Sequence, residues 1–361
     1  MAGVLVKHEA LRALGREILV SMGSDAREAG IVADHLVDAN LSGHDSHGVG
    51  LLPTYVRERH ADFVRPNRKA ILVREDGVFG ILDGDAGYGH VMAREATEWG
   101  IARAREKGAA IVTLRNAHHI ARVGTYAEMA IEAGMVSIFF VNVVAGGLQK
   151  VAPFGGSDAR LHTNPICIGV PMGSQPPFVL DFATSKIAMG KVRVAYNEKR
   201  KVAPGVLIDS HGVPTTEAAV LFEEPYGAIV PFGDHKGFGL AVMCELLGGV
   251  LSGGATNQDA GLRPGGLYNN LLAIFIDPTR FGELPYFHRE IEAVLAHVKA
   301  SPPANPGAPV LTAGEPERAY RNKRGAEGIP VDAVSWREIL DAADNAGVSD
   351  AAIAAAASAA R

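Results

Sequence analysis

The sequence is poor in cysteine and has no long, uninterrupted apolar run. Cys167 and Cys244 are the only two cysteines in 361 residues, and each stands alone in an apolar stretch. Two isolated thiols form neither a disulfide framework nor a zinc ribbon, so we expect two buried core cysteines. The apolar stretch 131–147 contains Glu132 and Asn142, which is not typical of a membrane-spanning helix. These features predict a protein without disulfides and without a membrane span.

Basic blocks are also absent. Lys+Arg minus Asp+Glu is 35 − 40 = −5, and a mildly acidic chain argues against nucleic acid as the main partner. Lys7, His8 and Glu9 interrupt the start of the chain, so we expect no secretory signal. Hydrophobic residues make up 47% and charged residues 21%, which is an ordinary globular balance. We therefore expect a soluble, cytoplasmic protein that binds neither nucleic acid nor membranes.

The usual glycine signature of dinucleotide binding is missing. Gly84, Gly87 and Gly89 lie between an expected strand and an expected helix, but their spacing is G-x-x-G-x-G instead of G-x-G-x-x-G. Glu106, the acid about twenty residues further on, lies near a helix end and not at the end of a second strand. We interpret this stretch as a glycine turn before a helix, so a nicotinamide cofactor would bind outside a Rossmann fold.

Histidines and serines could support other chemistry. Ser46 and His47 are neighbours, and side chains of neighbours are expected to diverge; the chain also has no G-x-S-x-G, so we discount a hydrolase. His44, His47, His118 and His119 lack the i, i+4 spacing of a helical zinc motif, so we predict no metal site. A histidine with a pKa near 6.5 can instead donate or accept a proton at cellular pH.

The order of the expected elements places this chemistry on a mixed core. Helical patterns cover residues 8–42 and begin again near Pro53, whereas short strands and helices alternate from about residue 70. From residue 284 helical patterns return. We predict a helical domain made of residues 1–70 and 284–361, around a mixed α/β region at 71–283. His118 and His119 end one of its strands, and His235 and Lys236 begin a helix whose N-terminus favours an anion.

Seven stretches, taken together and in this order, identify a resemblance. They are GHDSHGVGLLPTYV, RNAHHIARVGTYAE, TNPICIGVP, LDFATSKIAMGK, GVPTT, HKGFGLAVMCELLGGVLSGG and AGEPER, within residues 41–318. The chain resembles the malate/L-lactate dehydrogenase family of the non-Rossmann type. The resemblance implies hydride transfer between NAD or NADP and a 2-oxo acid. It also implies a homodimer and an α+β fold, in which a central, mostly antiparallel sheet binds the cofactor and the helical N- and C-terminal segments pack together.

The resemblance also assigns residues. His119 matches the catalytic histidine of the family, and Ser46 and His47 match a Ser-His pair at the substrate and nicotinamide. Leu51, Tyr55 and Arg122 are expected at the substrate. The implied cofactor contacts are His47, Ala121, Arg122, Val123, Val179, Leu180, Asp181, Phe182, Ala183, His235, Lys236, Asn270, Gly314 and Glu315.

The sequence departs from the pattern of the family at three positions: Leu51, His118 and His162. Leu51 replaces an Arg that many members carry, and such an Arg would hold a substrate carboxylate bidentately. We therefore hypothesise a preference for bulkier or aromatic side chains, with Arg122 or another basic group holding the carboxylate. His118 replaces a common Asn, and His162 replaces a Gly. Two alternatives to the 2-hydroxy-acid dehydrogenase stay open: a cyclic imino-acid reductase, and a non-catalytic ligand-binding or assembly protein on the same scaffold.

Overall fold

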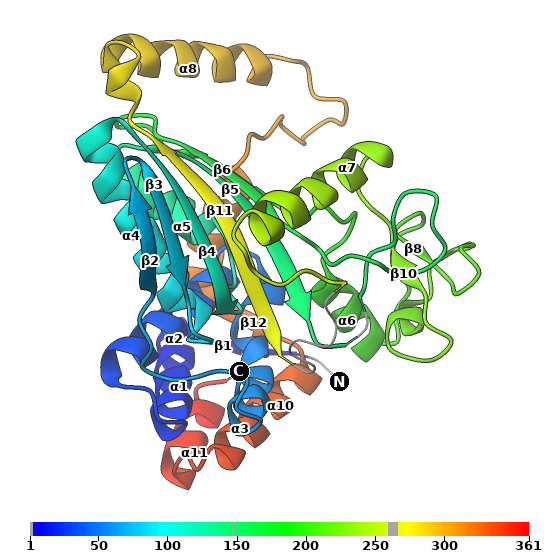
Figure 1. Ribbon diagram of the computed structural model, residues 1–361. Helices are drawn as coiled ribbons and strands as arrows, with labels where there is room; N and C mark the ends of the chain where they lie inside the picture. The colour runs from blue at the N-terminus through cyan, green and yellow to red at the C-terminus, as the bar shows by residue number, and fades with distance from the viewer. Residues whose placement is uncertain (1–2, 148, 259–265, 361) are drawn as a thin grey trace.

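The centre of the molecule is a seven-stranded sheet (Figure 1). The computed structural model describes residues 3–147, 149–258 and 266–360. The strands lie in the order β2-β3-β4-β11-β5-β6-β7. Their bounds are β2 (Ile71–Asp76), β3 (Phe79–Asp83), β4 (Ala109–His118), β5 (Val136–Ala145), β6 (Ile166–Val170), β7 (Phe178–Phe182) and β11 (Leu267–Ile276). The pairing of β3 with β4 is parallel and the other pairings are antiparallel, which confirms the predicted sheet type.

Helices cover both faces of this sheet. Figure 1 shows α4 (Gly89–Lys107) and α5 (Gly124–Glu132) on one face, and α7 (His235–Met243) on the other. A side chain at Gly100 of α4 would meet the Phe275 ring at 2.3 Å, so glycine allows this helix to approach the sheet closely. The helix expected to begin at His235 and Lys236 is α7, and it continues as a π-helix, η4 (Cys244–Val250). Both cysteines are buried, as predicted.

The two ends of the chain meet below the sheet. Helices α1 (His8–Ser21), α2 (Ala26–Leu41) and α3 (Leu52–His60) pack with α10 (Ala333–Asn345) and α11 (Asp350–Ser358). Strand β1 (Val4–Val6) pairs with β12 (Ile329–Val331), a contact that the sequence did not suggest. One hydrophobic core runs from these helices into the sheet. The prediction that the helical ends pack together is thus confirmed.

Helix α8 (Leu284–Lys299) lies at the opposite end of the molecule, away from these terminal helices (Figure 1). The predicted helical domain of residues 1–70 and 284–361 stays a prediction, and α8 does not pack with the terminal helices. Within the described ranges, the chain has no helix of the length and apolarity needed to cross a bilayer.

A small lobe with a core of its own completes the fold. It contains α6 (Met189–Asn197), η3 (Ala218–Leu221) and the short strands β8 (Leu207–Ile208), β9 (Pro214–Thr215) and β10 (Ala228–Ile229). Its helix α6 touches the 3-10 turn η1 (Asp45–His47): a side chain at Gly190 would lie 2.4 Å from the Ser46 Cβ atom. The lobe therefore borders the Ser46–His47 segment.

Candidate active site

Two predicted catalytic histidines come together from separate elements. His119 directly follows β4, and His47 ends η1. Their rings are stacked with centroids 5.7 Å apart and an interplanar angle of 14°. Ser46 Oγ lies 3.0 Å from His47 Nδ1, so the expectation that these neighbouring side chains diverge is wrong. The 3-10 turn brings the two side chains to the same side of the backbone.

The glycine turn at residues 84–89 packs against the end of β4, which carries His118 and leads into His119. A side chain at Gly89 would lie 1.9 Å from the His118 carbonyl oxygen, and one at Gly84 would lie 2.9 Å from Ala117 Cα. The His118 backbone N–H donates to the Gly87 carbonyl at 3.0 Å. These glycines serve close backbone approach, as expected for a turn before a helix, and they fix the segment that carries His119.

Behind His119 lies a buried aromatic cluster. The Tyr55 hydroxyl is 2.7 Å from His119 Nδ1 and 3.5 Å from His90 Nε2. His118 points elsewhere: its Nε2 atom lies 2.5 Å from the Glu58 carboxylate. Sequence reasoning missed His90 and Glu58. Glu58 follows Tyr55 by three residues on α3, so the helical spacing could have placed the two on one face; for His90 the sequence offered no such signal.

Burial keeps three imidazoles of the site neutral, those of His119, His47 and His90. Loss of water contact lowers the pKa of His119 well below 6.5, and the nearby imidazoles lower it further. Burial also lowers the pKa of His47 to about 4, and it lowers the pKa of His90 well below its ordinary value. These three neutral rings can accept a proton.

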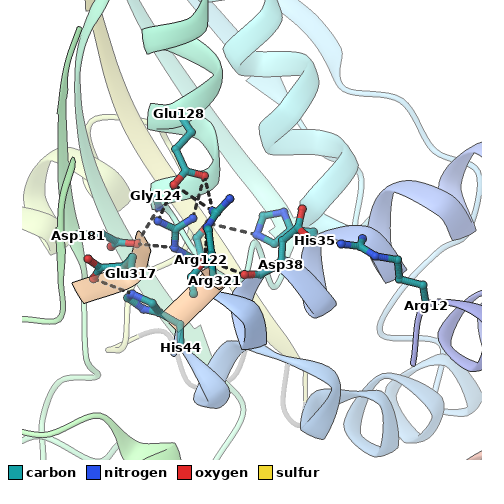
Figure 2. Close-up of polar contacts among 11 residues, drawn as sticks. Arg12, His35, Asp38, His44, Arg122, Gly124, Glu128, Asp181, Glu317 and Arg321 are labelled. Atoms are coloured by element: carbon teal, nitrogen blue, oxygen red, sulfur yellow. Dashed lines mark hydrogen bonds and ion pairs between the residues drawn. The ribbon is translucent and has the colours of Figure 1, made fainter. Parts of the chain in front are cut away.

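A charged network surrounds Arg122, with His35 and His44 at its edges (Figure 2). Arg122 is almost fully buried and donates through both terminal nitrogens to Glu128, each at 2.9 Å. Arg321 donates to the same carboxylate at 2.9 and 3.1 Å. Asp181 accepts from the Gly124 backbone N–H at 2.7 Å and lies 3.9 Å from Arg122 Nε. The network joins the turn after β4, strand β7 and helix α9 (Glu315–Glu327).

Helix α9, which the sequence did not predict, also holds the segment before His47. Arg324 donates to both oxygens of Asp45 at 2.6 and 3.0 Å, and to the Asn40 carbonyl at 2.5 Å. Glu317 lies 3.3 Å from His44 Nε2, as Figure 2 shows. The C-terminal part of the chain thereby fixes the η1 turn.

Most implied cofactor residues fall into two neighbouring groups. Ala121, Arg122 and Val123 form the turn into α5, beside Asp181. Strand β7 carries Val179, Leu180, Asp181 and Phe182, and Ala183 follows it. A side chain at Gly314, the N-cap of α9, would lie 3.4 Å from Val179 N, so Gly314 and Glu315 adjoin the start of this strand. A pocket of about 320 Å³ opens there; Pro177, Phe178, Lys299, Glu315 and Arg318 are among its lining residues.

The remaining predicted residues lie elsewhere or are already engaged. Asn270 accepts from the Asn116 N–H and donates to Asn142 and the Ala255 carbonyl, so its side chain is part of the framework. His235 and Lys236 begin α7, and their side chains are exposed. Within the described residues, neither contacts His119 or Asp181. Leu51 is half-buried against the main core. Arg122 is held by Glu128 through both terminal nitrogens, and its role at the substrate stays a prediction.

Within the part of the chain that the structure describes, no group of three or more His, Cys, Asp or Glu side chains is arranged to hold a metal ion. Three buried polar atoms in or near the charged network have no hydrogen-bond partner in this structure: Arg122 Nε, Thr125 Oγ1 and Glu317 Oε2. Buried polar groups without a partner are uncommon in proteins. These atoms are free to bond a ligand that binds beside the network.

The sheet, mostly antiparallel, is not that of a Rossmann fold, and comparison with known proteins gives the family of the chain. The family model for malate/L-lactate dehydrogenase matches residues 6–340, so the chain belongs to this family. It is 46% identical over 345 residues to hydroxycarboxylate dehydrogenase B of Escherichia coli (strain K12), covering 95% of this chain and 93% of that protein.

Solved structures agree with this assignment. An Escherichia coli structure, provisionally named a malate/lactate dehydrogenase, has a TM-score of 0.93 and 44% identity, and covers 98% of each chain. The Δ1-piperideine-2-carboxylate reductase of Pseudomonas syringae has a TM-score of 0.79 and 27% identity, and covers 94% of this chain and 99% of its own.

Proposed function

We propose that the protein is an NAD- or NADP-dependent 2-hydroxycarboxylate dehydrogenase in which His119 exchanges the proton. The observation that carries this proposal is the neutral, buried His119 ring, stacked on His47 and bound at Nδ1 by Tyr55. Reduction of a ketone carbon by hydride leaves an alkoxide that needs a proton, and the reverse oxidation needs a base. A positioned imidazole contributes roughly 100- to 10,000-fold to such steps. His47 and Ser46 would orient the reacting group.

The cofactor is supported by the polar groups that this fold leaves without partners. A bound nicotinamide dinucleotide would supply the hydride. The turn at Ala121–Val123, the β7 residues and the Gly314–Glu315 corner would hold it. Arg122 Nε and Thr125 Oγ1, both buried and unpartnered, offer a hydrogen-bond donor and a hydroxyl beside Asp181. We propose NAD as the cofactor, with NADP as the alternative that the assay below separates.

The direct test is the loss of NADH or NADPH absorbance with a panel of 2-oxo acids. The panel contains pyruvate, oxaloacetate, phenylpyruvate and hydroxyphenylpyruvate. Turnover with one or more of them would support the proposal and name the cofactor. Cofactor binding without turnover on any oxo acid would favour a different substrate or a non-catalytic protein, and absence of cofactor binding would overturn the proposal.

Leu51 is proposed to set the substrate side-chain preference. An Arg at this position could bind a substrate carboxylate through two hydrogen bonds, which would favour small acids. Leu51 instead offers an apolar surface to the substrate side chain. We expect Leu51→Arg to lower the ratio of aromatic to small-acid kcat/KM by at least about 10-fold, since one desolvated charge contact is worth about 1.5–3 kcal/mol. An unchanged ratio in a variant with unchanged thermal stability would refute the role of Leu51.

A cyclic imino-acid reductase is the second candidate, because the chain shares its fold with the Δ1-piperideine-2-carboxylate reductase. Imine reduction also consumes one hydride and one proton, so the same histidine pair would serve. Preformed Δ1-piperideine-2-carboxylate in the same absorbance assay separates the two: a kcat/KM above that of every oxo acid would favour the imine.

A further inference from the structure

The proton-carrying nitrogen of His119 depends on which way its hydrogen bond to Tyr55 runs. A neutral imidazole carries its proton either on Nδ1 or on Nε2. Tyr55 faces Nδ1 at 2.7 Å, and a hydroxyl can donate there or accept there. If Tyr55 accepts, His119 keeps a free lone pair on Nε2 and can act as a base. If Tyr55 donates, Nε2 carries the proton and cannot accept one.

His90 is the second partner of the Tyr55 hydroxyl, 3.5 Å from it through Nε2. His90 is fully buried, and burial together with the neighbouring imidazoles holds it neutral. It is also the second residue of the 19-residue helix α4, where the positive end of the helix dipole opposes an imidazolium. A neutral His90 carries one lone pair, and the tautomer with that lone pair on Nε2 can accept the Tyr55 proton. Its Nδ1 then carries the proton and has no hydrogen-bond partner in this structure.

The Tyr55 ring is held so that its hydroxyl stays between the two histidines. Tyr88, His90 and His118 pack edge-on against it, with ring centroids 6.1, 5.6 and 5.2 Å away. His118 is itself fixed by Glu58. The hydroxyl proton can therefore rotate between His90 and His119, whereas the ring stays in place.

We propose that Tyr55 and His90 are positioning residues that fix His119 in its Nδ1-protonated tautomer: His119 Nδ1–H donates to Tyr55 Oη, and the Tyr55 hydroxyl donates to His90 Nε2. Nε2 of His119 is then the nitrogen that takes the proton from a hydroxy acid and returns it in the reverse reaction. The tautomer is inferred from the 2.7 and 3.5 Å contacts of the Tyr55 hydroxyl, and only its catalytic consequence rests on the proposed function.

The test is nitrogen NMR of the ligand-free protein with ¹⁵N-labelled histidine, at a pH where the rings are neutral. The His119 signals are assigned by their loss in His119→Gln. We expect Nδ1 to be protonated in the native protein, and Tyr55→Phe to convert His119 to a mixture of tautomers. A native His119 protonated at Nε2, or a tautomer unaffected by Tyr55→Phe, would overturn the proposal.

Tyr88→Phe is the matched control, because Tyr88 packs against the same Tyr55 ring but has no contact with His119 among those described. Tyr55→Phe should lower kcat at least about 10-fold with unchanged cofactor affinity, as removal of a residue that orients a working histidine usually does. Tyr88→Phe should change neither kcat nor the tautomer. Equal losses in both variants would show that the effect is only one of packing. If no substrate is turned over, the proposed function fails, and the NMR result still decides the tautomer.

Discussion

At the scale of single residues, the unusual feature is the partner of His119. A carboxylate partner would favour the imidazolium and raise the histidine pKa, whereas the Tyr55 hydroxyl is neutral and does not. Burial is then the dominant influence, and the pKa of His119 falls well below 6.5. Under the proposed function, a neutral His119 suits the base role in hydroxy-acid oxidation, whereas oxo-acid reduction would need His119 to be protonated first.

The pH dependence of oxidation follows from this. A base must be unprotonated, so activity is lost when the pH falls through its pKa. The pH dependence of kcat/KM reports the ionisation of the free enzyme. We therefore expect the protonation of His119 to lower kcat/KM for hydroxy-acid oxidation only below pH 6.5. An acid limb centred at or above 6.5 that disappears in a His119 variant would contradict this account.

At the scale of elements, helix α9 connects the expected cofactor region with the catalytic turn. Gly314 and Glu315 begin the helix beside β7, and Arg324 near its other end holds Asp45 of η1. Between them Arg321 shares the Glu128 carboxylate with Arg122. One rigid helix thus fixes residues on both sides of the proposed reaction centre.

Breaking the Arg324 contact should affect turnover more than stability. Arg324→Met keeps the apolar stem but removes the donors to Asp45 and the Asn40 carbonyl. Small misplacement of catalytic groups can cost up to about 100-fold, so we expect kcat to fall roughly 10-fold. The control is Arg94→Met, which breaks an exposed salt bridge between Arg94 and Glu98. Both residues lie on α4, at a distance along the chain from η1. Equal kcat in the native protein and Arg324→Met would disprove the positioning role.

The elements themselves were largely predictable because their patterns are local. The run 109–114 is rich in apolar and β-branched residues, and it forms the first part of β4. Gly108 ends α4 in a left-handed conformation, where glycine is favoured. Strand β6, the β1–β12 pair and α9 were not predicted. Strand β6 is short, and β12 and α9 are stabilised by partners far away in the sequence, which no local pattern reveals.

The site was predictable only in part, for the same reason. His119 and the Ser46–His47 pair were found by resemblance, and the structure brings the two histidine rings together. The Tyr55–His90 contact joins residues 35 positions apart, and Arg324 reaches Asp45 across 279 positions. Such contacts depend on how whole elements pack, so sequence spacing could not indicate them.

At the scale of the whole molecule, buried neutral histidines link folding to pH. Burial lowers the pKa of His35 to about 3 and that of His162 to about 4, whereas both return to about 6.5 on unfolding. The unfolded chain then binds more protons, so stability is complete above pH 6.5 and is lost as the pH falls from 6.5 towards 4. Each such histidine contributes up to about 1.4 kcal/mol per pH unit in that window.

Replacing one of these buried histidines should make the free energy of unfolding depend less on pH below 6.5. His162→Leu keeps an apolar side chain in place of a ring whose Nε2 has no hydrogen-bond partner in this structure. We expect its free energy of unfolding, measured by urea titration, to fall less between pH 6.5 and 4.5 than that of the native protein. His60→Gln, at an exposed position, is the control for the loss of a histidine. The same fall in both variants would rule out the linkage.

The measurement that tests the central claim most directly is turnover of His119→Ala beside its cofactor affinity. If His119 exchanges the proton, kcat on the preferred acid should fall at least about 100-fold. The dissociation constant of the nicotinamide cofactor, measured by fluorescence, should stay within about twofold, since that change is under 0.5 kcal/mol. Turnover close to that of the native protein would contradict the account and move the proton role to His47.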